Sequence, residues 1–248
     1  MYHSNKPKTK KYIIDRLAER GISVNYESGQ IEKCESEETL HCRALYLLRH
    51  AETVGTSKKR FMSDSSENAV LTERGVEEVG RTGIVIAGMG FDYVYYSPIP
   101  RVRQTMEIVR KWNVNSIYME IPWMKGIDNA GWEGKAAVEL KSEDYEDFYQ
   151  REILHNIFAK SSLGCSWGEV LLRCIDLIDM INRLQEGKKI LLISQGSIFI
   201  GLSILLHLEK SLWENYDPEI FFGLKGNTSL HYGKLQYLYG EKLDYGEE

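Results

Sequence analysis

The sequence contains little proline and cysteine, with five prolines and four cysteines in 248 residues. The cysteines form no CxxC pair and show no spacing with histidine that would suit zinc, so free thiols in a reducing cytoplasm are expected. No apolar run reaches the roughly 18 residues of a membrane span. The one basic cluster, residues 6–11, precedes no apolar segment of a signal peptide. We therefore expect a cytoplasmic protein with no membrane association.

The sequence also lacks an excess of basic charge. Lysine and arginine total 31 against 36 acidic residues, for a net charge of -5. This balance argues against a nucleic-acid partner, because binding to phosphate backbones requires a basic surface. With 43% apolar residues, the chain can bury a core of ordinary size. No repeat or interdomain linker is visible, so one domain is expected.

We place that domain at residues 44–240, after an N-terminal extension of residues 1–43 and before a tail of residues 241–248. In the extension, Tyr12, Ile13, Leu17 and Ile22 have amphipathic helical spacing. The extension is expected to pack on the domain or on a second subunit without supplying catalytic groups. A homodimer is one oligomeric state that this leaves open.

From residue 44 onward, short β-type apolar runs alternate with longer stretches of helical period. Strands are predicted at 44–48, 91–96, 116–121 and 189–194, and helices at 72–87, 100–112, 136–157, 167–185 and 197–208. This alternation predicts an α/β fold with three αβα layers around a mostly parallel central sheet. Two further strands, 229–232 and 234–239, are predicted to form a closing hairpin around Gly233.

Charged and polar residues follow three of these predicted strands. Arg49 and His50 come after the first, residues 97–105 follow the second, and Gln195 and Gly196 follow the fourth. Ligands of open α/β sheets bind beyond the carboxyl ends of the strands. A neutral imidazole can attack phosphorus while guanidinium groups neutralise the phosphoryl oxygens. The sequence therefore predicts a phosphate site at this edge of the sheet.

Several segments carry a family resemblance. LLRHAET at 47–53 resembles the Arg-His-Gly/Ala-Glu-Thr signature of the histidine phosphatase (phosphoglycerate mutase-like) superfamily, and LTERG at 71–75 resembles its Leu-Thr-x-x-Gly. SPIPRVRQT at 97–105 is similar to Ser-x-Leu-x-Arg-Ala-x-Gln-Thr, and WEG at 132–134 also matches. Asn227 resembles the Asn found before the family's last strands. The likeness runs from about residue 44 to 240 in the family's order.

The resemblance implies that His50 is the nucleophile and becomes phosphohistidine. It implies that Arg49 and Arg101 bind the transferring phosphoryl group. Thr53, Gln195 and the helix start at Gly196 complete the implied phosphate-binding set. The implied ligand is a small phosphorylated molecule or free phosphate, with no metal and no other cofactor.

Two positions depart from the family pattern. Gln195 stands where the family has its second histidine, and an amide can donate a hydrogen bond but cannot shuttle a proton. Gly126 stands where the family has its general acid. Asp128 and Glu133 are the candidate replacements, although Asp128 could instead cap a turn and Glu133 could begin a helix.

Two functions from different classes fit this pattern. The first is a phosphatase that acts on a small phosphorylated metabolite through phosphohistidine. The alternative is a catalytically impaired pseudophosphatase that binds a phosphorylated ligand or partner. A mutase fits less well, because the family's mutases need both histidines and position 195 is glutamine.

Overall fold

A five-stranded sheet forms the centre of the computed structural model, which describes residues 8–184, 186–206, 233 and 235–243. The strand order is β5-β4-β6-β3-β7, and the pairings among β5, β4, β6 and β3 are parallel. The edge strand β7 pairs with β3 in the antiparallel direction. The strands span Ala44–Arg49 (β3), Tyr93–Tyr96 (β4), Ile117–Glu120 (β5), Lys189–Ser194 (β6) and Leu235–Gly240 (β7).

The two central strands β3 and β6 are buried along nearly their whole length. Such continuous apolar sequences are typical of parallel strands covered on both faces. Their register pairs Arg49 with Ser194, so both strands end at the same level. β4 ends beside them, because Tyr96 pairs with Ile193. The chain segments that follow these three strands therefore meet at one edge of the sheet.

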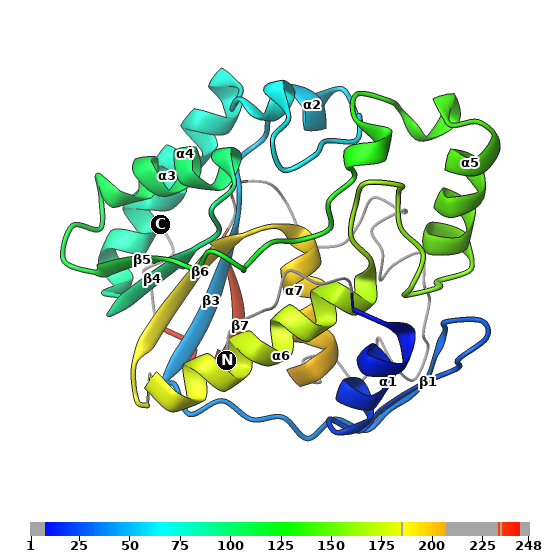
Figure 1. Cartoon of the computed structure of the whole chain (residues 1–248). Coiled ribbons are helices and arrows are strands. Elements are labelled where there is room, and N and C mark those ends of the chain that lie inside the picture. The colour runs from blue at the N-terminus through cyan, green and yellow to red at the C-terminus, as the bar shows by residue number, and fades with distance from the viewer. Residues whose placement is uncertain (1–7, 185, 207–232, 234, 244–248) are drawn as a thin grey trace.

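Helices cover both faces of the sheet, as Figure 1 shows. Helices α3 (Glu73–Met89) and α4 (Pro100–Arg110) pack on one face, and α6 (Trp167–Leu184) and α7 (Gly196–Leu206) pack on the other. The predicted three-layer α/β fold with a mostly parallel sheet is confirmed. Within the described part of the chain, no helix combines the length and apolar character needed to cross a bilayer.

The predicted helix over 136–157 is wrong. This segment contains a 3-10 turn at Ala137–Glu139, the short helix α5 at Ser142–Phe148 and a π-helical turn at Tyr149–Ile153. Leu140 and Lys141 are extended, so the backbone leaves the helical region before α5 begins, and Ser142 at the start of α5 has a positive φ of 52°. His155, with a φ of 55°, lies in the left-handed region after the π turn.

Other short elements surround the ends of the strands. They are α2 (Val54–Ser57) and the 3-10 turns Glu67–Ala69 and Ala130–Trp132. The predicted closing strand at 234–239 corresponds to β7, whereas its predicted partner at 229–232 and Asn227 lie outside the described residues. In the predicted tail, Leu243 is buried and its backbone N–H donates to the Tyr46 hydroxyl.

The described part of residues 1–43 packs tightly on the domain. It comprises α1 (Lys10–Ala18) and an antiparallel pair, β1 (Ile22–Val24) and β2 (Ile31–Cys34). Ile13 and Leu17 of α1 are buried in the same apolar core as α6 and α7. This segment thus covers one outer layer of the fold.

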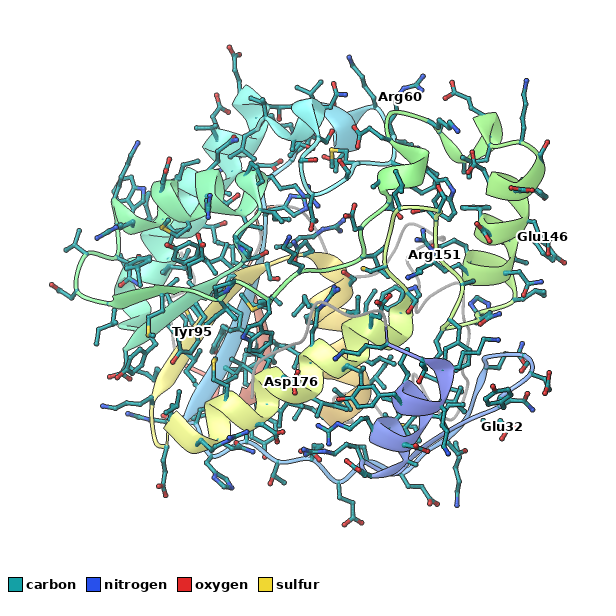
Figure 2. All side chains as sticks on the ribbon, viewed as in Figure 1. Glu32, Arg60, Tyr95, Glu146, Arg151 and Asp176 are labelled. Atoms are coloured by element: carbon teal, nitrogen blue, oxygen red, sulfur yellow. The ribbon has the colours of Figure 1, made fainter. Side chains whose placement is uncertain are left out.

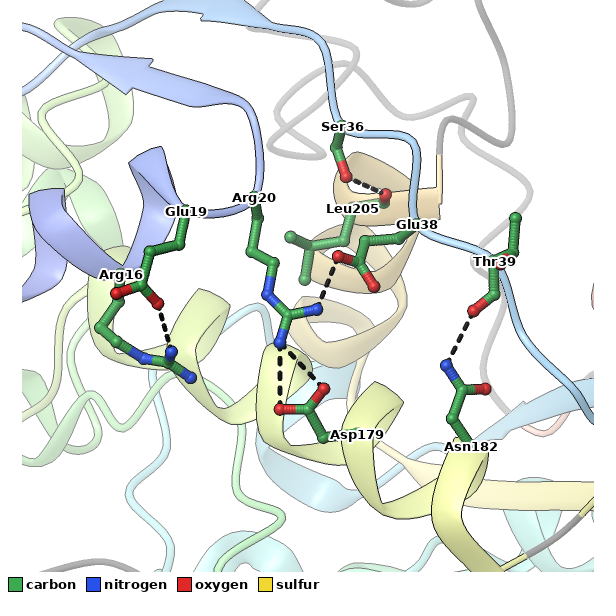
Figure 3. Close-up of polar contacts among 9 residues, drawn as sticks. All are labelled: Arg16, Glu19, Arg20, Ser36, Glu38, Thr39, Asp179, Asn182 and Leu205. Atoms are coloured by element: carbon green, nitrogen blue, oxygen red, sulfur yellow. Dashed lines mark hydrogen bonds and ion pairs between the residues drawn. The ribbon is translucent and has the colours of Figure 1, made fainter.

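Polar contacts hold the same segment against α6 and α7 (Figure 3). The Arg20 guanidinium binds Glu38 at 2.6 Å and Asp179 of α6 at 2.9 Å. The Ser36 hydroxyl donates to the carbonyl oxygen of Leu205 in α7. Arg16 and Glu19, by contrast, pair with each other within the segment.

We predict that Arg20→Met lowers the free energy of unfolding by about 1–3 kcal/mol, because two partly buried carboxylates lose their hydrogen bonds to a cation. The matched control Arg16→Met removes a more exposed pair and should cost no more than about 0.5 kcal/mol. Urea denaturation measures both. Equal effects of the two substitutions would contradict the assigned role of Arg20.

Candidate active site

His50 lies directly after β3 at the carboxyl edge of the sheet and is buried, with 4% of its surface exposed. Its backbone N–H donates to the Ser194 carbonyl, which fixes it to the end of β6. The ring atom Nδ1 lies 2.9 Å from the carbonyl oxygen of Ala51. Since a carbonyl oxygen can only accept, Nδ1 carries the proton in this contact. The lone pair of the neutral ring is then on Nε2.

The guanidinium groups of Arg101 and Arg49 affect the pKa of this imidazole. Burial lowers the pKa of His50 well below its ordinary value, and the positive charges of Arg101 and Arg49 lower it further. The Ala51 carbonyl opposes these effects without outweighing them. His50 is therefore neutral near pH 7, and it lies within the field of two cations that can bind an anion.

Arg101 enters the site from the first turn of α4, where Pro100 occupies a position that favours proline. The side chain is buried and donates from Nη1 to the carbonyl oxygen of Ser63 at 3.1 Å. Thr105, one turn later, was not singled out from the sequence. Its hydroxyl donates to the Arg101 carbonyl and accepts from the Ala51 N–H, so α4 and the His50 segment are joined directly.

Glu133 supports Arg101 through Ser63. Its carboxylate accepts from the Ser63 backbone N–H and from the Ser66 hydroxyl, both at 2.5 Å. Burial raises the pKa of Glu133, but these hydrogen bonds and the Arg101 charge outweigh that effect and leave it below its ordinary value. A carboxylate held in its ionised form is a poor proton donor.

Asp128 has the opposite character. Its pKa is raised by burial and by the nearby charge of Asp64, against the effects of backbone N–H groups and Lys125. The Asp64 backbone N–H donates to Oδ1 of Asp128 at 3.3 Å, and Lys125 pairs with Asp64 at 3.4 Å. Of the two candidate acids proposed from the sequence, Asp128 is the one whose surroundings favour the protonated form.

Gln195 is the single residue between β6 and α7, and Gly196 is the first residue of α7. Oε1 of Gln195 accepts from the Ser194 hydroxyl, and its Nε2 donates to the Ser97 hydroxyl. α7 begins at Gly196, and the N–H groups of Ile198 and Phe199 donate to the Gln195 carbonyl. The amides of Gly196 and Ser197 are therefore the ones at the start of this helix that can bind an anion. A Cβ atom on Gly196 would lie 3.5 Å from the Arg49 guanidinium. Arg49 is thus placed at the positive end of α7.

Thr53 is the N-cap residue of α2 and is buried. Its hydroxyl caps α2 by accepting from the Thr56 backbone N–H, and it also contacts the Met62 sulfur. The neighbouring Glu52 accepts from the Thr72 hydroxyl, and a Cβ on Gly75 would lie 2.5 Å from the Glu52 carbonyl oxygen. The LTERG motif therefore supports the backbone around His50.

Gly126 lies against Gln195. A Cβ atom at position 126 would collide with the Ser197 hydroxyl and lie 3.0 Å from the Cβ of Gln195. The Ser197 hydroxyl also accepts from the Ile127 backbone N–H at 3.0 Å. The space that a side chain at position 126 would need is thus occupied by the first turn of α7.

Solved structures with similar folds include proteins that act on phosphate esters. Bacillus stearothermophilus YhfR is 23% identical, with 77% of this chain and 88% of that chain covered and a TM-score of 0.61. A putative alpha-ribazole-5'-P phosphatase from Escherichia coli is 22% identical, with 70% and 84% covered and a TM-score of 0.59. At these identities, the comparisons show a shared phosphoglycerate mutase-like fold.

Sequence comparison identifies the family. The chain belongs to the histidine phosphatase superfamily (branch 1), whose family model it matches over residues 45–229. A probable phosphoglycerate mutase from Erwinia tasmaniensis is 24% identical over 153 residues, which cover 61% of this chain and 69% of that protein.

We predict that Gly126→Ala destabilises the protein by about 1–3 kcal/mol, because the added methyl group overlaps Ser197. Combining it with Ser197→Ala should recover part of this loss. Gly88→Ala in α3 is the control, since a Cβ there meets nothing within 4 Å and should stabilise the helix by up to about 1 kcal/mol. Urea denaturation of these three variants checks the packing, and a neutral effect of Gly126→Ala would show that the packing around position 126 is looser than described.

Proposed function

We propose that the protein is a phosphatase that hydrolyses a small phosphorylated metabolite through a phosphohistidine at His50. The observation that carries this proposal is the contact between Nδ1 of His50 and the Ala51 carbonyl. It leaves the lone pair on Nε2 of a neutral ring that is flanked by two guanidinium groups.

In the first step, Nε2 of His50 attacks phosphorus and forms an N–P bond while the bond from phosphorus to the ester oxygen breaks. Arg49 and Arg101 balance the charge of the phosphoryl oxygens, and the first amides of α7 add donors to them. The departing alcohol oxygen takes the carboxyl proton of Asp128, whose pKa is raised.

In the second step, water attacks the phosphohistidine and gives a proton to the Asp128 carboxylate. The N–P bond breaks, phosphate leaves, and Nε2 regains its lone pair. Gln195 donates at most neutral hydrogen bonds to the phosphoryl group, so we expect slow turnover. Removing a preorganised charge or donor from such a site typically costs about 100- to 1000-fold in rate.

The site and the names of similar proteins both support the proposed substrate class. Similar folds include a phosphatase of glucosyl-3-phosphoglycerate from mycobacteria, 16% identical with 81% of this chain and 92% of that chain covered and a TM-score of 0.59. Such names support a small phosphate monoester as the substrate here. A mutase reaction is less consistent with the site, since Gln195 cannot take up and return a proton.

The test uses 4-nitrophenyl phosphate as the substrate and an alkaline quench that preserves phosphohistidine. We predict that the unmodified protein releases phosphate and retains label from a radioactive phosphate ester. His50→Ala should lower turnover by at least about 1000-fold and abolish labelling. The control His41→Ala changes an exposed histidine before β3 and should leave both unchanged.

Two results would contradict the proposal. Turnover that persists in His50→Ala would show that another group accepts the phosphoryl. Phosphate binding without any turnover of the unmodified protein would instead support the pseudophosphatase alternative.

A further inference from the structure

The segment that carries Asp128 has no regular secondary structure, and side chains hold its backbone in place. In the described structure, residues 125–128 lie between β5 and the 3-10 turn Ala130–Trp132. The Ile127 N–H donates to Ser197 of α7, and the Asp128 N–H donates to the Cys165 sulfur at 3.3 Å. The Asp128 carbonyl accepts from the Cys165 N–H.

The carbonyl groups of the same segment converge on Arg173. Nη1 of this side chain donates to the Lys125 carbonyl at 2.9 Å and to the Gly126 carbonyl at 3.1 Å. It also lies 3.5 Å from the Cys165 sulfur, and the Cys165 thiol donates to the Gly126 carbonyl. Arg173 and Cys165 thus act on one short piece of backbone.

Arg173 is well suited to hold this segment still. It belongs to α6, an 18-residue helix that is buried along the sheet. Its guanidinium is planar and donates in fixed directions. By contrast, Arg151 reaches the next residue, Asn129, from the π-helical turn after α5. Figure 2 shows Arg151 in the interior while Glu146 of α5 lies at the surface.

We propose that Arg173 is a positioning residue for the leaving-group proton, because it fixes the backbone that places Asp128 at the departing oxygen. The inference rests on the proposed function, in which Asp128 is the acid. Gly126 leaves no side chain at its own position to protonate the departing oxygen, so the reaction depends on where Asp128 is held. An error of about 1 Å in such a position can cost about 100-fold in rate.

The experiment compares kcat/KM for 4-nitrophenyl phosphate and for propyl phosphate. The nitrophenolate leaves with little protonation, whereas the propoxide needs an acid. We expect Arg173→Met to lower the propyl-to-aryl ratio about 10- to 100-fold and to change the aryl rate by no more than about twofold. Arg173→Lys retains a charged donor group, so its propyl-to-aryl ratio should lie between those of the unmodified protein and of Arg173→Met.

Matched variants separate positioning from general structure. Arg183→Met, which removes an exposed arginine of the same helix, should leave the ratio unchanged. Cys165→Ser keeps both a donor and an acceptor and should retain the ratio, whereas Cys165→Ala should lower it. If Arg173→Met does not fold, the ratios of Cys165→Ser, Cys165→Ala and Arg173→Lys test the proposal instead.

Asp128→Asn distinguishes failure of this inference from failure of the proposed function. It should lower the ratio by at least about 100-fold, and adding Arg173→Met should then change the ratio no further. If Asp128→Asn lowers the ratio and Arg173→Met lowers both rates equally, Arg173 is only structural and this inference is wrong. If Asp128→Asn leaves the ratio unchanged, Asp128 is not the acid. The proposal that Arg173 positions this acid is then wrong as well.

Discussion

The hydrogen bond between Nδ1 of His50 and the Ala51 carbonyl is the contact on which the proposed chemistry depends. This hydrogen bond joins adjacent residues, so it depends only on the backbone conformation directly after β3. Burial and two nearby guanidinium groups keep the ring neutral. In the proposed mechanism, this nitrogen is the nucleophile, and the two cations beside it attract the phosphorylated substrate. Much of the surrounding fold maintains this geometry: β6 holds the backbone of His50, Thr105 ties it to α4, and the LTERG motif supports Glu52.

The two residues that depart from the family pattern, Gly126 and Gln195, lie next to each other. A side chain at position 126 would meet Ser197 and Gln195, so glycine at 126 and glutamine at 195 are compatible with each other at the two positions where the resemblance predicts an acid and a second histidine. The carboxylates nearby then take separate roles because their surroundings differ. Glu133 receives hydrogen bonds that keep it ionised and holds the backbone that Arg101 contacts. Asp128 is buried beside another acidic residue, which favours its protonated form. The surroundings of these two carboxylates, rather than their residue types, are the reason that we propose Asp128 and not Glu133 as the acid.

The alternation of apolar runs was sufficient to predict the sheet, the strand ends and the residues that meet there. β6 lies at its predicted bounds, and α3, α4 and α6 lie within a few residues of theirs. The prediction of one helix over 136–157 is wrong because the helical spacing of its apolar residues does not reveal the positive φ of Ser142 or the π turn at Tyr149–Ile153. The supporting roles of Thr105, Ser63 and Arg173 could not be predicted either. Each depends on a contact between a side chain and the backbone of a distant segment, and such contacts leave no periodic signal in the sequence.

The protonation state of His50 tests this account most directly. In 15N-labelled protein, long-range proton–nitrogen correlation spectra identify the imidazole tautomer, and loss of signals in His50→Asn assigns them to His50. We predict a neutral ring protonated on Nδ1 at pH 7 and still at pH 6.5, where an unperturbed imidazole is half protonated, since the pKa of His50 lies well below its ordinary value of 6.5. A ring that titrates near pH 6.5, or one protonated on Nε2 at neutral pH, would contradict it.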